Sequence, residues 1–340
     1  MSDAPSPKEI AALAAALSST ERPTTDRRNL LRLIDAVTRL TEGRASSLDV
    51  KIASVAIQEM QKAYEVFAPY RDARKVTIFG SARTRHDDPI YDLTVRTAAA
   101  LADEGYMVVT GAGPGLMEAG MVGAGRERSI GVSIRLPFES GANSVIAGDE
   151  KYVSMRYFFT RKLMLVKESH AFLCMPGGFG TLDETFELLT LAQTAKSVPV
   201  PIVFCEVEGR PFWTPLMDTL EPLLNDAGLI SPEDTTLYRI TDNPGDAVAE
   251  VTGFYRNYHS IRFVSDVMMI RLQRRIPDDT FVAIAARHAG LTDGTPMTQT
   301  GPTEAEVHDD DMLELPRVAL RYSAKGFAPL RPLIDDLNGH

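Results

Sequence analysis

The sequence predicts a doubly wound α/β fold built on a parallel, Rossmann-like sheet. Short, mainly apolar runs alternate with segments whose apolar residues recur at helical spacing, which is typical of strands covered by helices on both faces. Right-handed crossovers would bring the loops that follow the strands to one edge of the sheet, where ligands bind in this architecture. The strand candidates are 76–80, 106–111, 130–137, 171–176 and 201–207.

These strands and their helices define a predicted central domain at 71–258. Residues 1–70 are expected to form a mobile arm, rich in Ala, Ser, Pro and Thr, followed by a helical extension that begins at Arg28. Residues 259–340 break the alternation and predict a small α+β appendage with a disordered or extended insert near 291–311. The helical candidates of the central domain are 90–104, 116–127, 155–168, 182–194, 212–227 and 245–258.

Composition excludes several classes of function. The formal net charge of −10 argues against nucleic-acid polymers as partners, although a helix terminus with a few arginines can still bind a small anion. The six histidines lack metal-ligand spacing and the two cysteines, Cys174 and Cys205, lie in apolar strand candidates, so we expect neither a metal nor a disulfide. The N-terminus does not resemble a secretory leader and no apolar run reaches membrane-spanning length, which leaves the cytoplasm as the expected compartment.

The strongest chemical signal is the glycine-rich junction MPGGFGTLDE after the strand candidate at 171–176. Gly177, Gly178 and Gly180 allow close approach of a ligand to the backbone, and Thr181 is expected to begin a helix whose first amides favour an anion by ~0.3–1 kcal/mol per charge. The alternative is a capping box, in which Glu184 only returns a hydrogen bond to the helix N-terminus. Three glycines in four residues are more than a simple cap requires.

Two further junctions carry glycine. Gly113 and Gly115 follow the strand candidate at 106–111, but their spacing departs from the dinucleotide fingerprint, so we expect no NAD. Gly80 and Ser81 follow the first strand candidate and could offer an amide and a hydroxyl to a ligand. Taken alone, that pair is better explained by an ordinary tight turn.

One helix candidate, SMRYFFTRKLMLVKES, is apolar almost all round and is therefore predicted to be buried. Arg161 and Lys162 lie in its middle. A buried cation requires a carboxylate or a ligand phosphate within reach. The alternative is that the long side chains cover apolar surface and leave their charges in water, which is as plausible as function for Lys162 and less so for Arg161.

Together these residues resemble the LOG ("lonely guy") phosphoribohydrolases, many of which have been labelled lysine decarboxylases. PGGFGTLDE at 176–184 is similar to the PGGxGTxxE signature, Arg161-Lys162 to the family's RK pair, and GAGPGLMEAG at 111–120 to its glycine-rich segment. The resemblance covers roughly 75–258. The longer MRYFFTRK and the interrupted glycine segment are similar to the larger bacterial branch rather than to the plant-type proteins.

The resemblance implies hydrolysis of the N-glycosidic bond of a nucleoside 5′-monophosphate, giving a free base and ribose 5-phosphate. It implies that Glu184 and Arg161 are catalytic and that no cofactor is needed. AMP, a cytokinin ribotide or another monophosphate would be the substrate, and a dimer or larger homo-oligomer is expected. The substrate-binding residues it implies are Gly80, Ser81, Gly113, Gly115, Met155, Lys162, Gly177, Gly178, Gly180 and Thr181.

Two other functions compete with this one. A pyridoxal-dependent lysine decarboxylase needs a Schiff-base lysine and a partner for the pyridinium ring, and the sequence identifies neither. The second competitor is a nucleotide-binding or sensor protein of the same fold without enzymatic activity, since fold alone does not fix function.

Overall fold

A computed structural model describes residues 24–136 and 141–340, together with residues 8, 11, 12 and 15 near the N-terminus. Most of the predicted arm at 1–27 therefore lies outside the described residues. Two compact units are distinguished, Met1–Gln58 and Glu59–His340. The predicted helical extension is present as α2, Thr24–Glu42, and α3, Ser47–Phe67, the second of which crosses the boundary between the units.

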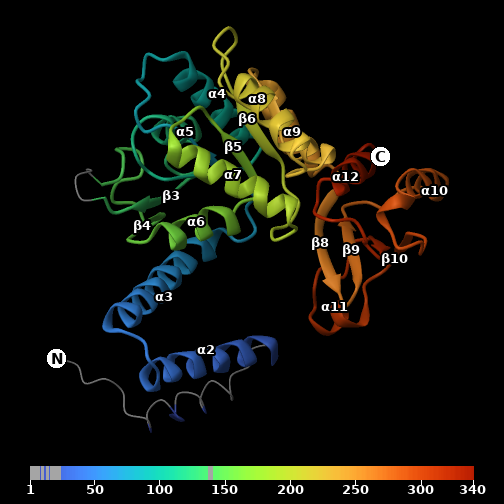
Figure 1. The fold of residues 1–340 in the computed structure, drawn as a ribbon, viewed down its shortest axis with the longest axis horizontal. Helices are drawn as coiled ribbons and strands as arrows, with labels where there is room; N and C mark the ends of the chain where they lie inside the picture. The colour runs from blue at the N-terminus through green and yellow to red at the C-terminus, as the bar shows by residue number, and fades with distance from the viewer. Residues whose placement is uncertain (1–7, 9–10, 13–14, 16–23, 137–140) are drawn as a thin grey trace. The chain divides into compact units, whose positions relative to one another are not determined.

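The centre of the larger unit is a parallel seven-stranded sheet in the order β4-β3-β2-β1-β5-β6-β7 (Figure 1). The doubly wound fold predicted from the sequence is thereby confirmed. Two short outer strands, β4 and β7, were not predicted, because neither has the continuous apolar run of a central strand. The strands are β1 Lys75–Phe79, β2 Met107–Thr110, β3 Ser129–Ile134, β4 Tyr152–Met155, β5 Ala171–Cys174, β6 Ile202–Cys205 and β7 Arg239–Thr241.

Helices cover both faces of this sheet because the buried strands alternate their side chains between two cores. In β1, Val76 and Ile78 pack on the side of α4, α5 and α9, whereas Phe79 packs on the side of α6, α7 and α8. Ala63 and Phe67 of α3 also enter the second core. The helices are α4 Pro89–Asp103, α5 Leu116–Ala124, α6 Phe158–Lys167, α7 Phe179–Gln193, α8 Trp213–Asp226 and α9 Pro244–Phe254.

The strand order changes direction between β1 and β5, which are neighbours in the sheet but are separated in the chain by three strands. The loops that follow these two strands diverge to opposite faces, so a crevice is expected at this position, at the carboxyl edge of the sheet. The loop after β1 contains Gly80 and Ser81, and the loop after β5 contains the glycine-rich junction. The topology thus brings two of the three predicted glycine junctions together.

Residues after α9 form a second, antiparallel sheet in the order β10-β11-β9-β8, covered by α10 and α12. The predicted disordered or extended insert near 291–311 is wrong in part, because this stretch contains η3, β10 and α11. The elements are β8 Tyr258–Val264, β9 Val267–Leu272, α10 Asp278–Arg287, η3 Ala289–Leu291, β10 Thr298–Thr300, α11 Glu304–His308, β11 Arg317–Leu320 and α12 Leu330–Asn338; η1 Ala68–Tyr70 and η2 Pro232–Leu237 lie earlier. Within the described parts of the chain, no helix is both long and apolar enough to cross a membrane.

A buried ion-pair network explains why the insert is ordered. Glu306, which is fully buried, accepts hydrogen bonds from Arg271 at 2.7 Å and Arg317 at 3.1 Å, and its carboxylate also caps α11 through the amide of Thr303. Burial raises the pKa of Glu306, but the Thr303 amide and the two guanidinium groups outweigh burial and lower it to about 2. The carboxylate therefore links α11 to β9 and β11.

Replacing Glu306 with glutamine should destabilise the second sheet, because two buried guanidinium groups then lose their shared counter-charge. We expect the free energy of unfolding to fall by about 3–5 kcal/mol at neutral pH, the usual range for breaking a buried pair. Urea denaturation followed by circular dichroism measures this change. Glu304→Gln, at an exposed position of the same helix, is the control and should change the free energy by less than about 0.5 kcal/mol.

The lowered pKa fixes the sign of the pH dependence. The stability that the charged Glu306 contributes is fully present above its ordinary value of 4.5 and is lost as the pH falls through about 2. The difference in unfolding free energy between the wild type and Glu306→Gln should therefore shrink on acidification across this window. If this difference in unfolding free energy stays constant with pH, the shape of the Glu306 side chain and not its charge stabilises the sheet.

Candidate functional site

The first turn of α7 is left without a side-chain cap. The helix begins at Phe179 with Gly178 at the N-cap, and no side chain in the described part of the chain caps this turn. The expectation that Thr181 begins the helix is wrong by two residues, and Glu184 consequently lies too far along the helix to complete a capping box. Helix amides that no side chain satisfies, at the positive end of the helix dipole, favour an anion.

Two glycines of this junction have no steric reason to be glycine. A Cβ at Gly178 or Gly180 would meet nothing within 4 Å, and neither residue has a positive φ. Gly177 differs, since a Cβ there would lie 2.2 Å from the hydroxyl of Thr181. The fold therefore requires glycine at 177, whereas at 178 and 180 glycine leaves bare backbone beside open space, as close approach of a ligand requires.

Arg161 of α6 and Glu184 of α7 form a buried ion pair at the same end of α7. Arg161 is 7% exposed, and its Nη1 lies 2.9 Å from Oε1 of Glu184. Its Nε donates a second hydrogen bond, of 3.0 Å, to the carbonyl of Val132 in β3. The prediction that Arg161 needs a carboxylate or phosphate within reach is confirmed. The alternative, in which the guanidinium lies in water, does not apply, because Arg161 is buried.

Gly111, at the end of β2, makes room for the guanidinium. A Cβ on Gly111 would lie 2.1 Å from Nη2 of Arg161. Sequence reasoning placed Gly111 in a glycine-rich segment without giving it a role. The requirement depends on a side chain from another element, which spacing within one segment does not reveal.

The environment of Glu184 suits a carboxylate that exchanges a proton. Burial raises its pKa above the ordinary value, while the charge and hydrogen bond of Arg161 and the charge of Lys162 oppose that shift. The net direction is upward. A buried carboxyl group with a raised pKa, held by one arginine, has the features of a general base in a water-poor site.

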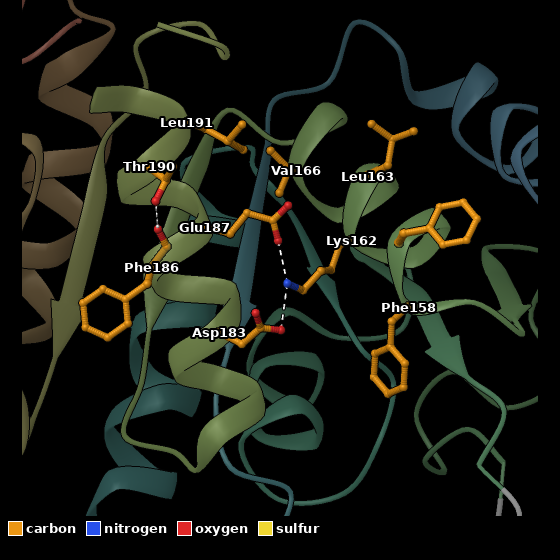
Figure 2. Close-up of a pocket in the computed structure, with 10 residues that line it drawn as sticks. Phe158, Lys162, Leu163, Val166, Asp183, Phe186, Glu187, Thr190 and Leu191 are labelled. Carbon is orange, nitrogen blue, oxygen red and sulfur yellow. Dashed lines mark hydrogen bonds and ion pairs between the residues drawn. The ribbon is translucent and has the colours of Figure 1, made fainter. Parts of the chain in front are cut away.

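Lys162 points into a groove between α6 and α7 (Figure 2). Its ammonium group lies 2.7 Å from Asp183 and 2.6 Å from Glu187. The groove has a volume of about 860 Å³, and its apolar walls include Phe158 and Leu163. Although adjacent in sequence, Arg161 and Lys162 thus pair with different carboxylates of α7.

The other predicted binding residues have identifiable packing roles. A Cβ at Gly80 would meet Leu116 at 2.8 Å, and one at Gly113 would meet Met117 at 2.7 Å. Met155, at the end of β4, is fully buried in the core.

Gly115, in the loop after β2, lies against Ser81, in the loop after β1. Gly115 has φ +68°, and a Cβ there would lie 2.4 Å from the carbonyl oxygen of Ser81. The hydroxyl of Ser81 accepts from the amide of Arg83 at 3.1 Å. These residues shape the loops that border the crevice.

A cavity of about 440 Å³ opens at this edge of the sheet, bordered by Ser81 and Gly177. Its lining includes Arg210, which pairs with Asp88 at 3.3 Å. Neither residue was predicted from the sequence, because both lie in loops outside the glycine-rich motifs. Among the residues that the structure describes, no group of three or more His, Cys, Asp or Glu side chains is arranged to hold a metal.

Comparison with known proteins matches residues 115–251 to a family described as "possible lysine decarboxylase". The cytokinin riboside 5′-monophosphate phosphoribohydrolase LOG1 of Arabidopsis thaliana is 26% identical over 163 residues, which cover 47% of this chain and 73% of that protein. The cytokinin riboside 5′-monophosphate phosphoribohydrolase of Mycobacterium tuberculosis is 27% identical over 184 residues, covering 51% of this chain and 90% of its own.

Among solved structures, the molybdenum cofactor carrier protein of Chlamydomonas reinhardtii is similar to 53% of this chain and 96% of its own, with 18% identity and a TM-score of 0.37. The matches in sequence fall on the part of the chain that contains α5, the Arg161–Glu184 pair and the glycine-rich loop of α7. The resemblance indicated by the sequence motifs is therefore confirmed: the central part of this chain is similar in sequence, at 26% and 27% identity, to proteins named as LOG-type phosphoribohydrolases.

Proposed function

We propose that this protein hydrolyses the N-glycosidic bond of nucleoside 5′-monophosphates, with AMP or a cytokinin ribotide as substrate. The observation that carries the proposal is the buried Arg161–Glu184 pair at the end of a helix whose first amides no side chain caps. The relatives named as phosphoribohydrolases support a hydrolase. Incubation with a panel of nucleoside monophosphates, followed by detection of free base and ribose 5-phosphate, tests it.

In the proposed reaction, Glu184 acts on water at the anomeric carbon. Cleavage of the bond to the base passes through an oxocarbenium-like ribose, whose positive charge a nearby carboxylate stabilises. Glu184 accepts a proton from water as the water oxygen bonds to the anomeric carbon, and the departing base takes the electron pair of the broken bond. The proton held by Glu184 then passes to the base, which leaves the carboxylate ready for another cycle. Arg161 keeps the Glu184 carboxylate oriented.

The 5′-phosphate is assigned to the loop before α7. Gly178, Gly180 and Thr181 supply the backbone of the first helical turn, and bare glycine backbone lets the phosphate oxygens reach it. Gly177 and Ser81 border the neighbouring cavity. Gly80, Gly113 and Gly115 pack closely against neighbouring side chains or backbone, and Met155 lies in the core. Binding the phosphate here positions the ribose for reaction.

The proposal extends to domains and assembly. We assign catalysis to 71–258 and treat 1–70 and 259–340 as additions to it. A second copy of the chain is the proposed occupant of the groove between α6 and α7, because Phe158 and Phe159 expose 56% and 55% of their surface there. Lys162 would then lie at the interface beside the site.

Glu184→Gln should abolish base release while the chain stays folded. The amide preserves shape but removes the charge and the proton acceptor, so we expect kcat to fall by about 10²–10⁴-fold. Release of free base from AMP measures the effect, and thermal melting verifies folding. Asp183→Asn is the matched control, since Asp183 is exposed and pairs with Lys162 instead. Near-wild-type turnover of Glu184→Gln would remove Glu184 from the chemistry.

Nucleosides without the 5′-phosphate should be hydrolysed far more slowly than the monophosphates. Phosphate binding at the α7 loop supplies the energy that holds the ribose in place, so its loss should lower kcat/KM by at least about 100-fold. Parallel assays of AMP and adenosine measure the ratio. Equal rates would contradict the phosphate assignment, and nucleotide that binds but stays intact would favour a sensor over an enzyme.

Arg161→Ala should remove activity, and Arg161→Lys should restore little of it. An ammonium group cannot donate at once to Glu184 and to the Val132 carbonyl in the planar geometry of a guanidinium. Assays of base release are run beside thermal melting with and without AMP. Lys167→Ala, at the exposed end of the same helix, is the control. Full activity of Arg161→Lys would show that any cation suffices.

A further inference from the structure

Helix α6 carries Arg161, yet its own sequence does not cap its N-terminus. The N-cap residue is Tyr157, which makes no side-chain capping bond, and the first turn of the helix contains no acidic residue. The first amides of a helix need acceptors from outside the helix, and a helix end without them frays. Because Arg161 lies in the first turn of α6, fraying would move its guanidinium.

Glu59, nearly one hundred residues earlier in the chain, supplies an acceptor at the N-terminal end of this helix. Its carboxylate accepts from the amides of Arg156 and Tyr157, the second at 3.4 Å, and from the hydroxyl of Thr160 at 2.8 Å. Glu59 is 8% exposed. The two amides belong to the N-cap residue and the residue before it, so the carboxylate holds the chain where it enters α6 and, through the Thr160 hydroxyl, the first turn of the helix. A carboxylate at this end of the helix is also favoured by the helix dipole.

The carboxylate is held in this position by the packing of α3. Glu59, Ala63 and Phe67 lie four residues apart and so share one face of that helix. Ala63 is fully buried and Phe67 is 2% exposed, both in the core that α6 and α7 also enter. The end of α3 lies beside α6 in the fold (Figure 1). The position of Glu59 is therefore fixed by core packing and not only by its hydrogen bonds.

We propose that Glu59 is a positioning residue for the Arg161–Glu184 pair, an inference that rests on the proposed function. Thr160 directly precedes Arg161, and the amide of Arg161 bonds to the carbonyl of Tyr157 at 3.2 Å. The Glu59 carboxylate thus fixes the helical turn that carries Arg161. The guanidinium of Arg161 extends from this turn to within 2.9 Å of the Glu184 carboxylate. The helical extension before the sheet thereby becomes part of the active-site architecture.

The test compares Glu59→Ala, Glu59→Gln and the control Glu65→Ala in the full-length chain with AMP as substrate. Glu65 is an exposed glutamate of the same helix that bonds to Gln61. We expect Glu59→Ala to lower kcat by about 10- to 100-fold, the effect of a small misplacement of catalytic groups, with KM changed by less than about 3-fold because the phosphate binds at α7. Glu59→Gln, which keeps an acceptor oxygen, should recover part of kcat, and Glu65→Ala should match the wild type.

Hydrogen exchange provides a readout that does not need activity. Amides of α6 from Phe158 to Lys162 should exchange at least about 10-fold faster in Glu59→Ala, while those of the second half of α7 keep their wild-type rates. Unchanged exchange in α6, or unchanged kcat per folded molecule, would overturn the positioning role. If the wild-type chain releases no base, the proposed function is contradicted instead. In that case, faster exchange of the α6 amides in Glu59→Ala would still establish that Glu59 holds this helix.

Discussion

The site depends on one buried ion pair, Arg161–Glu184. Burying both charges is costly, and their attraction offsets that cost only if the remaining hydrogen-bonding groups are also satisfied. The surrounding structure meets this condition through the Val132 carbonyl and the space left by Gly111. Strand β3, the end of β2 and two helices therefore converge on a single guanidinium, which explains why the site forms where these elements meet.

The arrangement separates two electrostatic tasks along α7. Its first turn, at Gly178–Thr181, presents amides and suits an anion, whereas Glu184, one turn later, is a carboxyl group whose pKa is raised by burial. Neither task requires a positive net charge, which reconciles a phosphate-binding role with a chain of charge −10. In the proposed site, the dipole of α7 and one paired arginine serve the role that a basic surface has in other anion-binding proteins.

Local signals in the sequence predicted the central sheet, the glycine loop and the need of Arg161 for a partner, because apolar runs, glycine clusters and a charge in an apolar helix are visible within one segment. Contacts between segments that are distant in the sequence were not predicted. Gly111 serves a side chain from α6, Glu59 caps a helix far along the chain, and the order of 291–311 depends on the burial of Glu306. The start of α7 was misplaced because TLDE matches a capping box that the fold does not use.

The geometry of α7 also bears on which substrates fit. A helix rises ~1.5 Å per residue, so the backbones of Gly180 and Glu184 are about 6 Å apart along the axis, and the backbone hydrogen bonds of the helix keep this separation nearly constant. A phosphate bound at the first turn therefore places the anomeric carbon near Glu184 only if one sugar with its 5′-carbon spans the gap. On the proposed function, a nucleoside lacks the anchor and a diphosphate shifts the ribose beyond the carboxylate. In that proposal, the helix assigned to the phosphate would also select the length of the substrate, and the loops at the sheet edge would contact the base.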